Sequence, residues 1–229
     1  MQKITFSFIQ ICRKKVFKIN ICFIGGGNHL NNELKEVIHQ LSNYVMTEHK
    51  VLIIPFATEV SKYEGWFKII EQTFNIIGNK NVELLQFETD AHDMVRKISA
   101  HDVLYLIGGR PDLLMQRLHE KNLIPVIKQF QGLIIGYSAG ALVLSNDCII
   151  SKDGDYPKTN VIKGIGLVDF SIEVHYEPSI DEEIIGLSNK REIYAIPNGS
   201  AIFSDGTKIM CINEIYHFSN LKKEKIALL

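Results

Sequence analysis

The sequence lacks the features that mark a membrane protein, a nucleic-acid-binding protein or an acidic tail. No stretch approaches the ~20 consecutive apolar residues that a membrane helix needs, and the 229 residues contain no repeat or low-complexity segment. Neither sign of charge predominates, because 25 lysines and arginines balance 26 aspartates and glutamates. We therefore expect neither a membrane nor a nucleic acid as a partner.

Cysteine is also scarce, with four residues in the chain: Cys12, Cys22, Cys148 and Cys211. No pair has the CxxC spacing of a metal site, and two of the four lie in apolar runs. Buried free thiols are typical of a protein in a reducing compartment. We therefore expect a cytoplasmic protein without a metal site.

The N-terminal segment does not have the order of a secretory signal. Its basic cluster, Arg13 to Lys15, follows a short apolar run instead of preceding a longer one, and no small-residue cleavage site is evident. We interpret residues 1–18 as an N-terminal extension or an extra strand. No linker divides the remainder, which predicts a single domain over residues 19–229.

Short apolar runs alternate with amphipathic segments through the first two thirds of the chain. The runs are Ile19–Ile24, Lys50–Phe56, Val82–Phe87, Asp102–Ile107 and Gly132–Gly136. Apolar residues at both parities are typical of strands covered on both faces, and the intervening segments have helical periodicity. The pattern predicts an α/β fold of three layers, with a mostly parallel sheet and helices on both faces. After Ser145 shorter alternating strands, with a turn at Asp205-Gly206, predict a C-terminal antiparallel extension of that sheet.

A serine stands between small residues where one apolar run ends, in the stretch GYSAGA. A hydroxyl is a poor nucleophile unless a base takes its proton and donors receive the developing oxyanion. A tight turn from strand to helix exposes such a side chain, and only small neighbours fit around it. Ser138 is therefore a candidate nucleophile and the N–H of Ala139 a candidate oxyanion donor. The alternative is a Gly/Ser-rich turn without chemistry.

Two other strand ends are rich in glycine. Gly108-Gly109 precedes Pro111, which suits the first position of a helix, and paired glycines expose backbone N–H groups where open α/β sheets bind ligands. The stretch IGGGNHL lacks the full GxGxxG pattern, so it is only weak support for a dinucleotide site.

The candidate base comes from eight histidines. His175 ends the alternating segment SIEVHY, and a strand end in this fold class is well placed for a base. Asp147, Asp153 and Asp155 lie between the serine and this histidine and are candidates for the orienting acid. The order serine, acid, histidine matches the α/β-hydrolases, but the interval is too short for the strand–helix units of those enzymes.

The segments YLIGG, GYSAGA and VHY together resemble the dipeptidase E (alpha-aspartyl dipeptidase) family of serine peptidases, over about residues 19–203. The resemblance implies a sheet like the flavodoxin-like sheet of class I glutamine amidotransferases, with serine in place of their cysteine. It implies Ser138 as nucleophile, His175 as base and Asp153 as the acid, with Asp155 or a glutamate elsewhere as alternatives. No metal or cofactor is required.

The same resemblance implies an oxyanion hole formed by Gly109, with Gly108 beside it, and by Ala139. We expect the protein to hydrolyse short peptides through an acyl-enzyme, with an acidic N-terminal residue as the candidate specificity. The segment after the histidine is acidic and holds Arg191 alone among arginines. Arg110, beside the oxyanion hole, could instead hold a substrate carboxylate through a bidentate contact.

Two other functions are compatible with these motifs. A non-catalytic amidotransferase-like domain would keep the glycine-rich turns and bind a small ligand or a protein partner. A glutamine amidotransferase subunit is disfavoured, because a serine lacks the thiolate chemistry of such enzymes. We expect a monomer or a homodimer with a short peptide as its substrate.

Overall fold

The structure is a computed structural model and describes residues 20–226. The segment interpreted as an N-terminal extension, residues 1–18, lies outside the described residues, as does Cys12. Cys22 and Cys148 are buried free thiols and Cys211 is a half-buried one, as predicted. No helix in residues 20–226 is long and apolar enough to cross a membrane.

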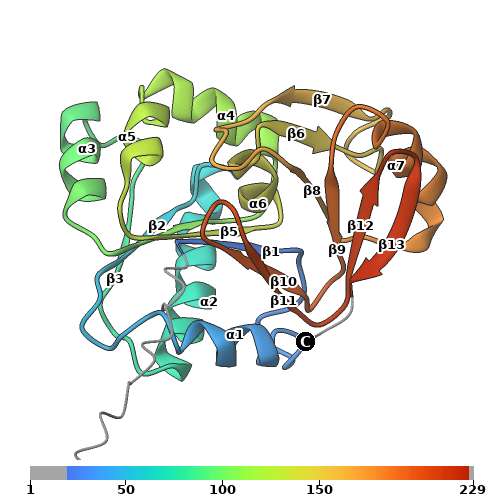
Figure 1. The fold of residues 1–229 in the computed structure, drawn as a ribbon. Coiled ribbons are helices and arrows are strands. Elements are labelled where there is room, and N and C mark those ends of the chain that lie inside the picture. The colour runs from blue at the N-terminus through green and yellow to red at the C-terminus, as the bar shows by residue number, and fades with distance from the viewer. Residues whose placement is uncertain (1–19, 227–229) are drawn as a thin grey trace, which may run out of the picture.

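A mostly parallel sheet forms the centre of the molecule (Figure 1). Its strands are β1 (Ile21–Ile24), β2 (Val51–Ile54), β3 (Val82–Leu84), β4 (Val103–Leu106), β5 (Leu133–Tyr137), β10 (Ala201–Ser204) and β11 (Ile209–Ile212). They lie in the order β11-β10-β1-β5-β4-β2-β3. The first five strands of the chain are mutually parallel, and β10 and β11 extend the sheet in antiparallel fashion. The predicted hairpin at Asp205-Gly206 joins these last two strands.

Helices cover both faces of this sheet and make the three predicted layers. They are α1 (Lys35–Leu41), α2 (Tyr63–Ile76), α3 (Ala91–Ser99), α4 (Pro111–Glu120), α5 (Ile124–Gln129) and α6 (Ala139–Leu144), with a 3-10 turn at Val60–Lys62. Figure 1 shows α1 and α2 below the sheet and the other four above it. The apolar residues of β1, β2, β4 and β5 are buried from both sides, which explains their continuous apolar sequence.

A second sheet lies beside the first, at the right of Figure 1. Its strands are β8 (Ser171–Val174), β9 (Ile193–Ile196), β12 (Ile215–Ser219) and β13 (Lys222–Ile226), in the order β13-β12-β9-β8. Helix α7 (Asp181–Leu187), preceded by a 3-10 turn at Pro178–Ile180, packs against it. A small separate core joins them, formed by Ile149, Tyr176, Ile184, Ile193, Ala195 and Phe218.

The expectation of one extended sheet is therefore correct for β10 and β11 alone. Strands β8 and β12 occupy both edges of β9, so β9 has no edge left for the central sheet. An additional hairpin, β6 (Asp147–Ile150) and β7 (Asn160–Lys163), forms a third, two-stranded sheet. Alternating polarity identifies such strands in the sequence but does not say which partner each one takes.

Candidate active site

Ser138 lies in a strained turn between β5 and α6. Its backbone has φ 52° and ψ −114°, a conformation that a residue with a side chain rarely adopts. The neighbouring glycines make the turn possible, because a Cβ on Gly136 would lie 2.5 Å from the carbonyl oxygen of Gly140, and one on Gly140 would lie 2.1 Å from that of Leu106. The N–H of Ser138 donates to Ile24 O at 2.9 Å, which fixes the turn to β1.

His175 contacts Ser138 from the second sheet. It follows β8 directly, and its Nε2 lies 2.7 Å from Ser138 Oγ. Its backbone is also strained, with φ 49°, and its N–H donates to Gly25 O at 2.8 Å. The hydrogen bond to Gly25 ties the end of β8 to the end of β1. The two residues predicted as nucleophile and base are therefore within hydrogen-bonding distance.

The third position is occupied by an asparagine and not by the predicted Asp153. Nδ1 of His175 lies 2.7 Å from Oδ1 of Asn198, which follows β9. Oδ1 of Asp153 instead accepts hydrogen bonds from the N–H groups of Asp155 and Tyr156, at 2.8 and 2.9 Å. Asp153 thus shapes its own loop, and neither it nor Asp155 contacts His175 among the described hydrogen bonds.

This arrangement favours one tautomer of the neutral imidazole. Because Oδ1 is an acceptor, Nδ1 of His175 carries the proton, which leaves Nε2 free to accept from the Ser138 hydroxyl. The sequence offers one signal that could have identified Asn198: a polar residue directly after the strand segment EIYAIP, followed by glycine. The resemblance implies a carboxylate at this position and therefore does not point to an amide.

Gly26 makes room for this pair of side chains. It has φ +135°, and a Cβ there would lie 2.3 Å from both Cε1 and Nδ1 of His175 and 2.4 Å from Asn198 Oδ1. Gly26, in the glycine-rich stretch IGGGNHL, therefore leaves room for the imidazole and the amide. Gly26 O also accepts from Gly199 N at 3.0 Å, so the strand end holds the residue next to Asn198.

Gly109 and Ala139 are the residues whose N–H groups are expected to stabilise the oxyanion. Gly109 and Ala139 line the same cavity as Ser138, and their N–H groups donate to no acceptor in residues 20–226. Gly109 has φ +134°, and a Cβ there would lie 2.4 Å from Ala57 O. Gly108 packs behind them, where a Cβ would lie 3.0 Å from the ring of Tyr137. It supports the turn and does not line the cavity.

Arg110 does not present its charge to the cavity. Its guanidinium pairs with Asp112, with Nη2 2.6 Å from Oδ2, and Tyr156 donates to Oδ1 of the same carboxylate at 2.7 Å. Burial raises the pKa of Asp112, but the hydrogen bonds from Arg110 and Tyr156 outweigh burial and lower it overall. Arg191 likewise lies 3.2 Å from Asp147. The two arginines considered for a substrate carboxylate each have an acidic partner.

The catalytic cavity has a volume of about 500 Å³. Besides Ser138, His175, Gly109 and Ala139, it is lined by four carboxylic acids and one lysine: Asp153, Asp155, Glu173, Glu177 and Lys152. Burial raises the pKa of Glu173 to about 8, an effect that Ser151 opposes and that Glu183 and Asp153 reinforce.

A smaller cavity of about 430 Å³ is also lined by His175, together with Asn198, His29 and Trp66. Burial lowers the pKa of His29 to about 4, so this imidazole is neutral at pH 7.

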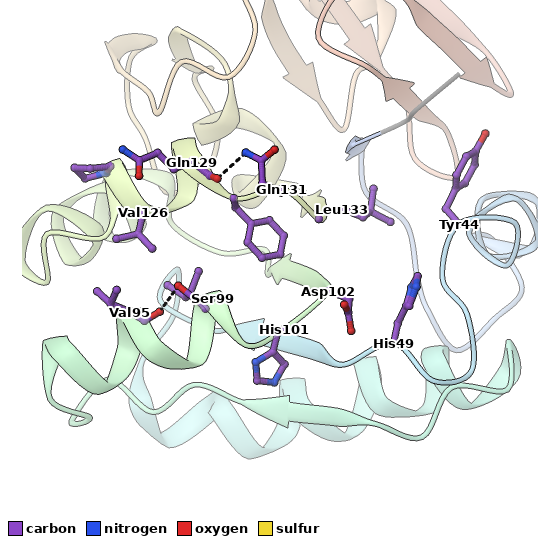
Figure 2. A pocket seen from close by; sticks show the side chains of 14 residues that line it. Tyr44, His49, Val95, Ser99, His101, Asp102, Val126, Gln129, Gln131 and Leu133 are labelled. Carbon is purple, nitrogen blue, oxygen red and sulfur yellow. Dashed lines mark hydrogen bonds between the residues drawn. The ribbon is translucent and has the colours of Figure 1, made fainter. Parts of the chain in front are cut away.

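A third cavity, of about 710 Å³, lies at the opposite edge of the sheet (Figure 2). Figure 2 shows His49, His101 and Asp102 around it, where β2, β4 and β5 begin. Ser99 points away to Val95 O, and no polar constellation like that of Ser138 occurs there. No group of three metal-ligating side chains occurs in the described part of the chain.

The chain is similar in sequence to known peptidases. The sequence model of peptidase family S51 matches residues 21–212. An uncharacterized peptidase of Listeria monocytogenes is 26% identical over 196 residues, which are 79% of this chain and 95% of the relative. Peptidase E of a Nostoc species is 24% identical over 194 residues, which are 76% of this chain and 78% of that protein.

Two crystal structures have a similar fold. One, of a candidate peptidase E from Listeria monocytogenes, has a TM-score of 0.67 and 23% identity, covering 85% of this chain and 98% of that chain. The other, of a peptidase from an acI-B1 actinobacterium, has a TM-score of 0.65 and 18% identity, covering 92% and 95%. At these identities the structures support the fold alone.

Proposed function

The chain belongs to peptidase family S51 and is a serine-type peptidase, and from this premise we propose that it hydrolyses short peptides with Ser138 as nucleophile and His175 as base. The observation that carries the proposal is the 2.7 Å contact between Ser138 Oγ and His175 Nε2 at a strained strand-to-helix turn. The strain presents the hydroxyl to the cavity and leaves free N–H groups beside it.

The reaction follows from these positions. Ser138 Oγ attacks the peptide carbonyl while His175 Nε2 takes its proton, and Asn198 Oδ1 holds Nδ1–H so that the ring keeps its orientation. The N–H groups of Gly109 and Ala139 receive the negative charge of the tetrahedral intermediate. His175 then gives the proton to the leaving amine. Water, activated by the same imidazole, releases the acyl group from Ser138.

An acidic N-terminal residue is not part of this proposal. Arg110, the residue considered for its recognition, is paired with Asp112. A substrate carboxylate would have to displace that partner at close range. Lys152 is the one cation that lines the cavity, and four carboxylic acids line it as well.

The test is a panel of dipeptides with acidic, basic and neutral residues, assayed with wild type, Ser138→Ala and Ser42→Ala. Ser42 is an exposed serine directly after α1, bonded to His39 O, and serves as the matched control. We expect hydrolysis by wild type and Ser42→Ala, and a loss of at least about 10³-fold in Ser138→Ala. Equal hydrolysis by the two serine variants would show that Ser138 is not the nucleophile. No hydrolysis of any peptide by wild type would favour the non-catalytic ligand-binding domain.

A further inference from the structure

The carboxylic acids of the catalytic cavity come from two separate segments. Asp153 and Asp155 lie in the loop between β6 and β7, and Glu173 and Glu177 lie in β8 and just after it. Since the folding of these segments brings four acids to the cavity that holds Ser138, the cavity has an excess of negative potential. Lys152 is its single basic side chain.

Among these four acids, Glu173 is distinguished by its burial and its hydrogen bonding. Its side chain lines the cavity although the residue is only 4% exposed. Ser151 Oγ donates to Oε2 at 2.6 Å, whereas Oε1 has no hydrogen-bond partner in residues 20–226. Oε1 is not among the buried side-chain atoms without a partner in the described residues, so a group in the cavity can reach it. It therefore marks where a positively charged donor would be stabilised.

The nearby cations do not supply that donor. Lys152 contributes no hydrogen bond or ion pair to Glu173 in the described structure, and Arg110 is engaged by Asp112. The neighbours that act on Glu173 electrostatically, Glu183 and Asp153, are acidic as well. A neutral or acidic substrate group would leave the negative charge of these carboxylic acids uncompensated, whereas an ammonium or guanidinium group would neutralise part of it.

We propose that the cavity binds the side chain of a lysine or arginine next to the cleaved bond, with Glu173 as the residue that determines this specificity. The proposal rests on the peptidase function proposed above and specifies its substrate class. The carboxyl of Glu173 gives up its proton to water when the cation binds, because the ion pair favours the carboxylate. The long aliphatic chain of lysine lets its ammonium reach a group set back in the cavity.

The experiment compares peptides that differ by one ammonium group. Lysine and norleucine are paired at each side of the bond, as Lys-Ala against Nle-Ala and Ala-Lys against Ala-Nle, with Asp-Ala as the acidic member. The measured quantity is the ratio of kcat/KM for the lysine peptide to that for its norleucine partner. In wild type we expect a ratio of at least about tenfold in one of the two pairs, as one charge-assisted hydrogen bond supports.

Glu173→Gln should reduce that ratio by about tenfold, because the amide keeps the shape and removes the charge. The matched control is Glu120→Gln, at the exposed end of α4, which should keep the wild-type ratio. Asp155→Asn, at an exposed position in the same cavity, should lower the ratio less. This second variant decides the question if Glu173→Gln does not fold.

Binding provides a readout that does not depend on turnover. Isothermal titration of Lys-Ala and Nle-Ala into the Ser138→Ala protein should give tighter binding of the lysine peptide. Cleavage of the panel without any preference for lysine, or with preference for Asp-Ala through Lys152, would overturn the specificity and leave the peptidase intact. Absence of cleavage would reject the proposed function, and the ratio of the two binding constants would then decide on the cationic subsite by itself.

Discussion

A neutral amide, Asn198, holds the imidazole that accepts the proton from Ser138. It supplies a hydrogen-bond acceptor for Nδ1 of His175 at 2.7 Å but no countercharge for the imidazolium that forms during attack. A carboxylate in the same place would supply both. The orientation of the base and its electrostatic support can therefore be separated experimentally at this one residue.

We expect Asn198→Ala to lower kcat by roughly 10²-fold, the low end of what a positioned base contributes, because Nδ1 loses its acceptor. Asn198→Asp keeps the acceptor and adds a negative charge, so its kcat should equal or exceed that of wild type. The measurement is kcat on the best dipeptide, with urea unfolding as a control for stability. Wild-type kcat in Asn198→Ala would show that His175 is held without this residue.

Glu173 couples the catalytic cavity to the stability of the fold. Its pKa is raised from 4.5 to about 8 in the folded chain, mainly by burial. Between these two pH values the unfolded chain releases the proton first, so stability falls as the pH rises through this window. Below about 4.5 both states are protonated, and above about 8 the loss is complete.

Glu173→Gln removes this titration. Relative to wild type we expect the variant to gain stability as the pH rises from 5 to 8.5, by an amount on the order of a few kcal/mol. Urea unfolding at the two pH values measures the difference. If the free energies of unfolding of variant and wild type differ by the same amount at both pH values, Glu173 does not carry the proton inferred here.

At the scale of elements, the loop between β6 and β7 forms one wall of the cavity and is hydrogen-bonded to α4. Tyr156 in this loop donates to Asp112 near the start of α4 at 2.7 Å, and Asp153 accepts two N–H groups of the loop itself. Among the described hydrogen bonds, the bond from Tyr156 joins the loop to α4. Its loss should loosen the wall without touching Ser138 or His175.

Tyr156→Phe removes the hydroxyl that bonds to Asp112 and contacts Arg110, and keeps the ring. We expect KM for short peptides to rise by about fivefold, as a net loss of about 1 kcal/mol implies, while kcat changes little. Tyr194→Phe, which removes a hydroxyl bonded to Glu192 in the second sheet, is the matched control. A fall in kcat with unchanged KM in Tyr156→Phe would mean that the loop positions the catalytic groups instead of the substrate.

For the molecule as a whole, the sequence predicts those features that depend on a single strand, helix or turn. The apolar runs predicted the central strands, and the stretch GYSAGA predicted the turn at Ser138, because both depend on local sterics and burial. The role of Asn198 could not be predicted in this way. It depends on β9 pairing with β8 in a sheet separate from the central one, and alternating polarity leaves the partners of a strand open.

The site is assembled between two sheets, and each contributes part of it. Ser138 follows β5 of the central sheet, whereas His175 and Asn198 follow β8 and β9 of the second. The second sheet rests on its own small core, in which Ile184 of α7 is fully buried. The position of His175 should therefore depend on the packing of that small core. A substitution of similar cost in the main core should leave it unchanged.

Ile184→Ala and Ile98→Ala test this dependence with the same substitution in the two cores. Both side chains are 0% exposed, so each variant should lose about 2–5 kcal/mol of stability. Under conditions where both are folded, kcat/KM should fall by about tenfold or more in Ile184→Ala, because a misplacement of about 1 Å can cost 10²-fold. Ile98, in α3 on the main core, lies at the opposite edge from Ser138, so Ile98→Ala should keep wild-type activity. Equal activity of the two folded variants would mean that the contact of His175 with Gly25 holds the base in place without help from the second core.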